Sequence, residues 1–221
     1  MSTETILSAM PSLSASDLAR ASRYVRDGRI LVVPTDTVYG IGCAADNPEA
    51  VAAVLAAKGR GSQMPPPVLV ASADAIDSLC VDAPDYARRL ARAFWPGGLT
   101  LILKARPDLG WDLGETGGTV GVRMPAQEAL LALLTDVGPM AVTSANLTGQ
   151  PPATSVDQAL GYFGTRVGAY LDAGPTKGST ASSIVDCAHG TPRVIRLGTI
   201  SLDDLSQAAG VSIDAPQGGN A

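Results

Sequence analysis

The chain has 221 residues, of which 46% are hydrophobic, so it is long and apolar enough for one domain with its own core. Its formal net charge of −5 argues against broad, non-specific adhesion to nucleic acid, which relies on neutralising many phosphates, and leaves room only for a small basic cleft. No stretch approaches the roughly 18 apolar residues of a membrane span, and MSTETILSAM lacks the basic start of a signal peptide. We therefore expect a cytoplasmic protein without membrane contact.

Helical periodicity recurs along the whole chain. Ser14 and Asp17 have capping-box spacing and predict the start of a first helix, which Gly28 ends. Pro48 suits the first turn of a second helix, which we expect to run to Ala57. Further helices are predicted over 73–79, 84–94 and 128–134, near Val156, and after Ser201.

Predicted strands alternate with these helices, at 29–36, 68–71, 99–105, 119–125, 139–146, 166–172, 182–186 and 193–198. Parallel strands need crossover connections, which the helices would provide. The fold class expected is therefore α/β, with a twisted, mixed, largely parallel open sheet and helices on its faces. The final residues, APQGGNA, are expected to be disordered.

The common nucleotide-binding motifs do not fit. GxxxxGK[ST] is absent, and GPTKGST at 174–180 has the wrong spacing for a phosphate loop. GIGCAA at 40–45 matches GxGxxA only superficially, because Asp46-Asn47-Pro48 delays the following helix. Cys43, Cys80 and Cys187 are scattered without CxxC spacing, so buried reduced thiols are expected and no metal site.

The segment VLAAKGRGSQMPPPVLV places Lys58 and Arg60 at a helix end, just before three prolines. Basic residues in a last helical turn interact favourably with the negative end of the helix dipole, and that is a sufficient structural explanation for both. The prolines also favour a second interpretation, because they force a stiff, extended exit that could present two cations at a site. The residues alone leave both open.

Polar clusters end several predicted strands. PTDTVYG places two hydroxyls around a carboxylate, TSAN provides Thr143, Ser144 and Asn146, and Arg123 ends the strand TVGVR. Each cluster could simply be a turn. In open α/β sheets, however, ligands bind beyond the carboxyl ends of strands, so a shared site that clamps a carboxylate or phosphate is plausible.

VVPTDTVYGIG, Lys58-x-Arg60, FWPGGLTLIL, VGVRMP and TSANLTGQP occur in the order and spacing typical of one family. The chain resembles the YrdC-like family of threonylcarbamoyl-AMP synthases, in their short, single-domain form, over about residues 14–205. The resemblance implies a YrdC/RibB-like fold with a positively charged concave face. It makes 1–13 an N-terminal extension and 206–221 a C-terminal end.

The resemblance also implies the reaction and its site. ATP, L-threonine and bicarbonate would give threonylcarbamoyl-AMP and pyrophosphate, the first step of tRNA threonylcarbamoyladenosine modification, with Mg2+ accompanying ATP. Lys58 and Arg60 would be catalytic. The residues implied to bind ATP are Lys58, Arg60, Met64, Thr119, Ser144, Asn146 and Arg196, and those implied to bind L-threonine are Thr37, Arg123, Val142 and Ser182.

The sequence departs from the family in several places. A histidine that contacts threonine in relatives is absent, and the single histidine, His189, lies in a predicted solvated turn. Pro152 replaces a common serine, and Leu197 replaces a proline after Arg196. The expected partner is a complex that transfers the threonylcarbamoyl group to tRNA. A non-catalytic RNA-binding module and a carbamoyl-transfer maturation factor are the alternatives, and weak RNA binding stays open.

Overall fold

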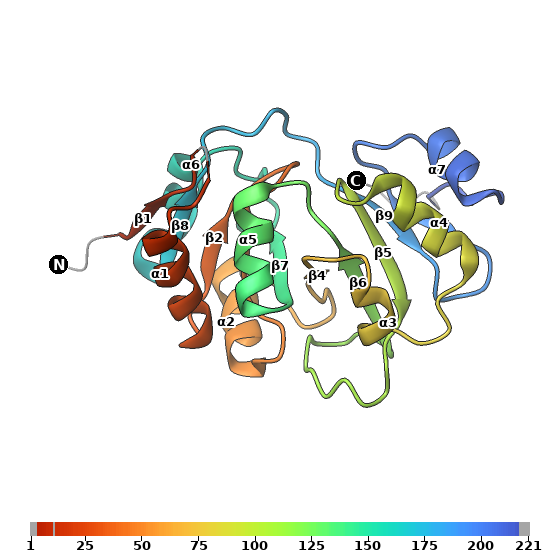
Figure 1. The fold of residues 1–221 in the computed structure, drawn as a ribbon, viewed down its shortest axis with the longest axis horizontal. Helices are drawn as coiled ribbons and strands as arrows, with labels where there is room; N and C mark the ends of the chain where they lie inside the picture. The colour runs from red at the N-terminus through yellow and green to blue at the C-terminus, as the bar shows by residue number, and fades with distance from the viewer. Residues whose placement is uncertain (1–3, 11, 217–221) are drawn as a thin grey trace.

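The computed structural model describes residues 4–10 and 12–216, and within these it contains a ten-stranded sheet and seven α-helices (Figure 1). The strands are β1 (Ile6–Ser8), β2 (Leu31–Val33), β3 (Gly40–Ala44), β4 (Val68–Leu69), β5 (Leu99–Lys104), β6 (Thr119–Arg123), β7 (Met140–Ser144), β8 (Ala169–Asp172), β9 (Ser183–Asp186) and β10 (Arg193–Arg196). The helices are α1 (Ala15–Arg26), α2 (Pro48–Lys58), α3 (Ala75–Leu79), α4 (Asp85–Phe94), α5 (Glu128–Val137), α6 (Val156–Phe163) and α7 (Leu202–Ala209), with a 3-10 turn at Gly164–Arg166.

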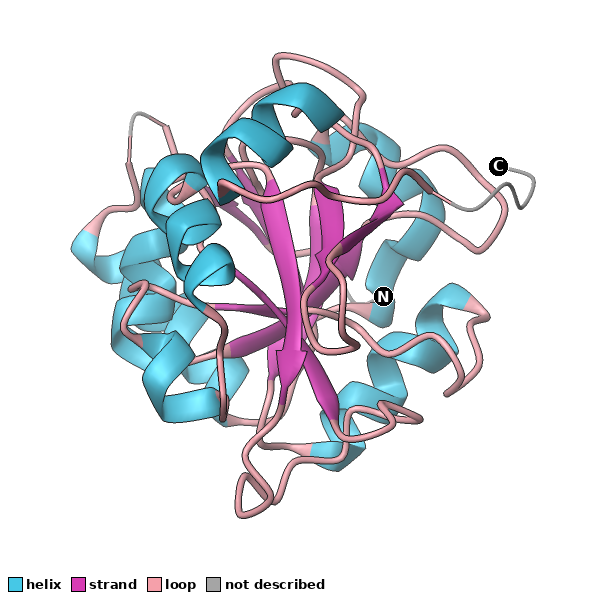
Figure 2. Ribbon diagram, turned by 90° about the vertical axis from the view of Figure 1, so that its right-hand side faces the viewer, coloured by secondary structure: helices cyan, strands magenta, loops and turns pink. Residues whose placement is uncertain are grey.

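The sheet order is β1-β8-β2-β3-β7-β4-β6-β5-β9-β10, and Figure 2 shows the strands fanning out with the twist of the sheet. The predicted mixed, open α/β sheet is confirmed. Its parallel share is smaller than predicted, because only the pairs β1-β8, β2-β8, β4-β6 and β5-β9 are parallel. The other five pairs are antiparallel.

The prediction of a largely parallel sheet was wrong because three pairs of neighbouring strands are joined without a helix. The loop 34–39 joins β2 and β3, the loop 105–118 joins β5 and β6, and the loop 187–192 joins β9 and β10, so the chain reverses direction each time. The buried strand β3 was also missed. Its sequence, GIGCA, has two glycines and no alternation of polar and apolar residues.

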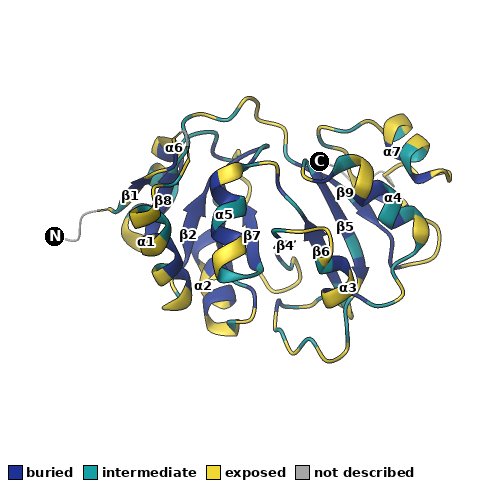
Figure 3. Cartoon of the chain, in the orientation of Figure 1, coloured by how far each residue is buried: buried dark blue, intermediate teal, exposed yellow. Residues whose placement is uncertain are grey.

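Alternate residues of the central strands enter two separate cores. Leu31 and Val33 of β2 pack beneath α1 and α5, whereas Val32 belongs to the larger core that includes residues of α2 and α6. This alternation is the period of two that a strand covered on both faces requires. Figure 3 shows the strands buried and the outer faces of the helices exposed.

Local sequence signals determine where α2, the helix that precedes Arg60, begins and ends. Asn47 Oδ1 accepts a hydrogen bond from Ala50 N (2.9 Å) at the start of α2, and Pro48 occupies its first turn. Gly59 ends the helix with φ 65°, a left-handed conformation that glycine adopts without strain. Lys58 therefore lies in the last turn, and Arg60 follows the cap.

The ends of the chain differ from the expected segments. Residues 6–8, placed in an N-terminal extension, form strand β1 beside β8, and α7 continues past residue 205. The domain boundaries themselves stay a prediction. The predicted disorder of the tail falls mainly on 217–221, which lie outside the described residues.

Two other expectations can be compared with the structure. Cys43, Cys80 and Cys187 are buried free thiols, as predicted. In the part of the chain that the structure describes, no helix combines the length and the apolar character needed to cross a bilayer.

Candidate functional site

A cavity lies on the face of the sheet opposite a row of core residues. Leu101, Val122 and Val185 pair across β6, β5 and β9 and are fully buried. Because side chains alternate along a strand, their neighbours emerge on the other face. That face and the adjoining loops line the cavity, and on it the strands β5, β6 and β9 contribute Thr100, Ile102, Thr119, Gly121, Arg123 and Ile184.

Eight of the eleven predicted site residues line this one cavity: Thr37, Arg60, Thr119, Arg123, Val142, Ser144, Ser182 and Arg196. They come from segments far apart in the sequence. Lys58, Met64 and Asn146 are not among the lining residues. The roles assigned to all eleven stay predictions.

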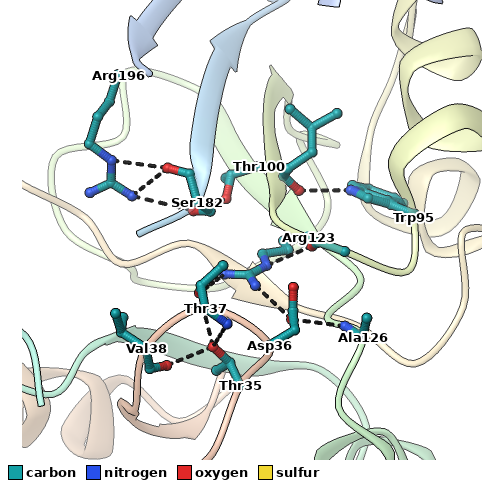
Figure 4. Close-up of polar contacts among 12 residues, drawn as sticks. Thr35, Asp36, Thr37, Val38, Trp95, Thr100, Arg123, Ala126, Ser182 and Arg196 are labelled. Carbon is teal, nitrogen blue, oxygen red and sulfur yellow. Dashed lines mark hydrogen bonds and ion pairs between the residues drawn. The ribbon is translucent and has the colours of Figure 1, made fainter. Parts of the chain in front are cut away.

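Arg123, at the end of β6, is buried and held from three sides (Figure 4). Its Nε donates to Gly97 O (2.9 Å), its Nη1 to Thr37 Oγ1 (3.2 Å) and its Nη2 to Asp36 Oδ1 (2.7 Å). Burial lowers the pKa of Arg123, while the charge of Asp36 opposes that effect. The guanidinium is thus a fixed cation at the cavity wall.

The loop between β2 and β3 determines what Thr37 can offer a ligand. Thr35 Oγ1 lies 2.6 Å from Val38 O and donates its proton there. Since the hydroxyls of Thr35 and Thr37 are 3.0 Å apart, Thr37 must donate in that contact. Thr37 Oγ1 therefore presents only acceptor capacity, which suits a ligand with N–H or O–H groups.

Arg196, in β10, reaches back to the segment before β9. Its Nε and Nη2 donate to Ser182 O (3.1 and 2.9 Å), and Ser182 Oγ lies 3.2 Å from Thr100 Oγ1. Two strands and a loop thereby meet around Ser182. Leu197, the residue that departs from the family, follows Arg196 and is 46% exposed.

Arg60 is only partly satisfied within the protein. Its Nη1 donates to Thr143 Oγ1 (2.9 Å), whereas its buried Nε has no partner among the described residues. Burial, and then repulsion from Arg196, lowers the pKa of Arg60. A buried donor without a partner is costly to the folded protein.

The cavity carries a concentration of positive charge. Arg60, Arg123 and Arg196 all line it, and none of its lining residues is Asp or Glu. Burial, and then the neighbouring Arg123, lowers the pKa of Arg196, which reflects repulsion between the cations. An anionic ligand would relieve this repulsion.

Lys58 holds the loop after β7. Its ammonium donates to Ser144 O, to Asn146 O (2.8 Å) and to Asn146 Oδ1 (3.3 Å). The side chain of Asn146 completes the loop by donating to Leu147 O and Gln150 O (2.9 and 2.8 Å). Asn146 thus braces the loop, and Lys58 contacts the backbone of Ser144 from outside the lining of the cavity.

The proline run forms part of the cavity wall. Pro65, Pro66 and Pro67 line the cavity, and Pro67 O accepts a hydrogen bond from Val142 N (2.9 Å). This supports the interpretation of a stiff segment beside the site. Met64, which precedes them, is 43% exposed and is not among the lining residues.

Sequence reasoning missed the loop between β5 and β6. Leu113 and Thr116 of this loop line the cavity. Glu115 N donates to Ser62 O (2.9 Å) and Ser62 Oγ to Glu115 Oε1 (2.8 Å), which joins the loop to the segment after Arg60. No sequence pattern indicates these hydrogen bonds, because they join two irregular segments. The pairing of Asp36 with Arg123 was missed in the same way.

The single histidine takes no part in the cavity. The side chain of His189 is 63% exposed and contacts Asp186, 3.1 Å from Nδ1 to Oδ2. This agrees with the predicted solvated turn. In the described ranges, no three His, Cys, Asp or Glu side chains gather as a metal site would require.

Comparisons with known proteins match most of the chain. The Sua5_yciO_yrdC family model, described as "Telomere recombination", matches residues 23–198. A Mycobacterium leprae protein, provisionally named a threonylcarbamoyl-AMP synthase, is 50% identical over 201 residues, which are 91% of each chain.

Two solved structures have the same fold. Pyrococcus abyssi Sua5 complexed with L-threonine superposes with a TM-score of 0.88 at 30% identity, over 96% of this chain and 62% of that one. E. coli YciO, at 24% identity, superposes with a TM-score of 0.83 over 93% of this chain and all of its own. The chain therefore belongs to the Sua5/YciO/YrdC family of threonylcarbamoyl-AMP synthases.

Proposed function

We propose that this threonylcarbamoyl-AMP synthase, a nucleotidyltransferase of tRNA threonylcarbamoyladenosine modification, binds ATP and L-threonine side by side in the cavity described above. The observation that carries the proposal is the set of three cavity arginines without a lining carboxylate. ATP is an anion and L-threonine carries a carboxylate, and charge-assisted hydrogen bonds from arginine suit both phosphate and carboxylate groups.

L-threonine would bind at Arg123, with its carboxylate on the guanidinium. Thr37 would accept a hydrogen bond from the amino or hydroxyl group of the substrate, since its own proton is used within the protein. The threonine complex of the P. abyssi relative supports this class of substrate. Val142 and Ser182, which also line the cavity, would complete this part of the site.

The triphosphate would lie toward Arg60 and Arg196. Arg60 lines the cavity together with Ser144 and Thr119, so its guanidinium would attract the phosphates. Cations placed where charge develops on departing pyrophosphate stabilise the transition state. Lys58 would act by holding the backbone of Ser144 and Asn146 in place.

The reaction needs no covalent intermediate with the protein. The threonine nitrogen adds to the carbon of bicarbonate, water leaves, and a carbamate forms. A carbamate oxygen then bonds to the α-phosphorus of ATP while the bond to pyrophosphate breaks. The protein supplies proximity by holding both reactants, together with the electrostatic effect of its arginines.

Mg2+ would enter with ATP. The lining residues include no carboxylate, so they fit a metal held mainly by phosphate oxygens rather than by the protein. The ion would supply charge neutralisation on the phosphates. The product would pass to a separate complex that transfers the threonylcarbamoyl group to tRNA.

The test is a pyrophosphate-release assay with ATP, Mg2+, bicarbonate and L-threonine, with the adduct identified by mass spectrometry. Arg123→Ala should raise the KM for L-threonine by about 10- to 100-fold, because charge-assisted hydrogen bonds are worth about 1.5–3 kcal/mol. The KM for ATP should change little. If only the KM for ATP moves, the threonine assignment is wrong.

A further inference from the structure

Asp36 forms an ion pair unlike any other in the described residues. The side chains of Asp36 and Arg123 are 17% and 7% exposed, whereas each of the other six ion pairs has a side chain at least 44% exposed. Exposed ion pairs contribute little to stability. The one pair that is largely removed from water lies at the cavity wall.

The carboxylate is fixed as firmly as the arginine. Asp36 Oδ1 accepts from Arg123 Nη2 (2.7 Å) and from Ala126 N (2.9 Å), which ties the loop after β2 to the segment after β6 (Figure 4). The neighbouring Thr35 accepts a hydrogen bond from Thr37 N (3.1 Å) and donates to Val38 O, so the backbone around Asp36 is a closed turn. Asp36 has little freedom to move.

This arrangement leaves a specific set of donors on Arg123. A guanidinium has five N–H groups, and Gly97, Thr37 and Asp36 each occupy one. One N–H therefore remains on Nη1 and one on Nη2. A pair of N–H groups on the two terminal nitrogens matches the two oxygens of a carboxylate.

The negative charge of Asp36 would by itself weaken the binding of the substrate carboxylate. A negative group beside Arg123 repels a substrate carboxylate, and so lowers the affinity that Arg123 could provide if it were held by neutral groups. The gain has to come from geometry, because a site held within about 0.5 Å of its productive arrangement loses less freedom on binding. These two effects act on the KM for L-threonine with opposite signs.

We propose that Asp36 is a positioning residue for the L-threonine site, which orients the Arg123 guanidinium so that its two remaining N–H groups face the substrate carboxylate. The inference rests on the proposed function, in which Arg123 binds that carboxylate. Asp36 does not touch the substrate. It acts through Arg123, and it links the two segments that carry Thr37 and Ala126.

The experiment compares Asp36→Ala with Asp36→Asn in the pyrophosphate-release assay. Asp36→Ala should raise the KM for L-threonine by about 10- to 100-fold, the range expected for loss of one charge-assisted hydrogen bond. Its kcat and its KM for ATP should stay within about 3-fold, because only a substrate-binding group is displaced. Asp36→Asn should stay within about 5-fold, because the amide oxygen can still accept from both donors.

A double-mutant cycle separates positioning from general destabilisation. In an Arg123→Ala background, Asp36→Ala should have no further effect on the KM for L-threonine, since the group it positions is gone. Asp186→Ala is the matched control, because Asp186 is also buried and contacts an arginine and a backbone N–H outside the cavity. It should lower the Tm while leaving the KM for L-threonine unchanged.

Several results would overturn the proposal. One is an Asp36→Ala enzyme that folds and has an unchanged or lower KM for L-threonine, and another is an undiminished effect in the Arg123→Ala background. If Asp36→Ala does not fold, Asp36→Glu replaces it, and its longer side chain should raise the KM about 10-fold by displacing the guanidinium. A wild-type KM in Asp36→Glu would refute positioning. A normal KM in Arg123→Ala would refute the proposed threonine site itself, which is a distinguishable outcome.

Discussion

Lys58→Met tests whether Lys58 works through the loop that it holds. Burial, and then the neighbouring Arg60, lowers the pKa of Lys58 to about 8. At 1.36 kcal/mol for each pH unit, this means that the buried ammonium costs about 3 kcal/mol relative to water. Methionine has a similar length and no charge, so the substitution removes that cost.

The same substitution leaves the carbonyl groups of Ser144 and Asn146 without their ammonium donor. A buried acceptor that loses its donor costs about 1–3 kcal/mol. Two such acceptors lose about 2–6 kcal/mol, so against the cost of about 3 kcal/mol that is removed the net change lies between a gain of about 1 and a loss of about 3 kcal/mol. About 2–4 °C of Tm corresponds to each kcal/mol in a chain of this size. Lys58→Met should therefore fold, with a Tm at most about 12 °C below that of the parent protein.

The functional loss should be larger than this stability loss suggests. A displacement of about 1 Å in a positioning group can lower a rate by about 10²-fold, so we expect a fall of that size in kcat/KM for ATP. Lys104→Met, at an exposed position, should behave like the parent protein. Pyrophosphate release at varied ATP measures the effect, and a Lys58→Met enzyme within about 3-fold of the parent would refute the reasoning.

Two other predictions concern pH and backbone contact. Lys58 holds the loop in its protonated form, so kcat/KM for ATP should fall as pH rises through about 8, and a profile that stays flat to pH ~9.5 would contradict a role for its charge. Gly198→Ala should lower both Tm and activity, because its Cβ would lie 2.1 Å from Ala181 O and 2.4 Å from Ser182 C, and both are backbone atoms that cannot turn aside. Thermal melting and the same activity assay would check this, and an unchanged Tm would show that the segment has room to shift.

The helices were predictable because their signals are local. Pro48 and Gly59 set the ends of α2, and Ser14 caps α1 by accepting a hydrogen bond from Asp17 N (3.1 Å). The direction of the strands was harder to predict from the sequence. β2 and β3 run antiparallel because a short loop joins them, and in the sequence this loop looks like ordinary polar residues after a strand. The two glycines of β3 also remove the alternation of polar and apolar residues that would predict a strand.

The sequence could show which polar residues end or follow predicted strands, Thr37 and Arg123 among them. It could not bring these two together, because β2 and β6 run in opposite directions with β3, β7 and β4 between them. The direction of Lys58 could not be predicted either, because its ammonium meets oxygens of a loop that lies more than 80 residues further along the chain. Asp36 was visible as a carboxylate between two hydroxyls, but only the folded chain shows which cation it holds.

The sheet order interleaves early and late parts of the chain. β1 lies beside β8 and β2 beside β8, and β9 completes the half of the sheet that begins with β4. Cutting the chain anywhere near its middle would thus remove strands from both halves of the molecule. Neither fragment could assemble the cavity, so we expect two inactive polypeptides to regain activity only when they are folded together.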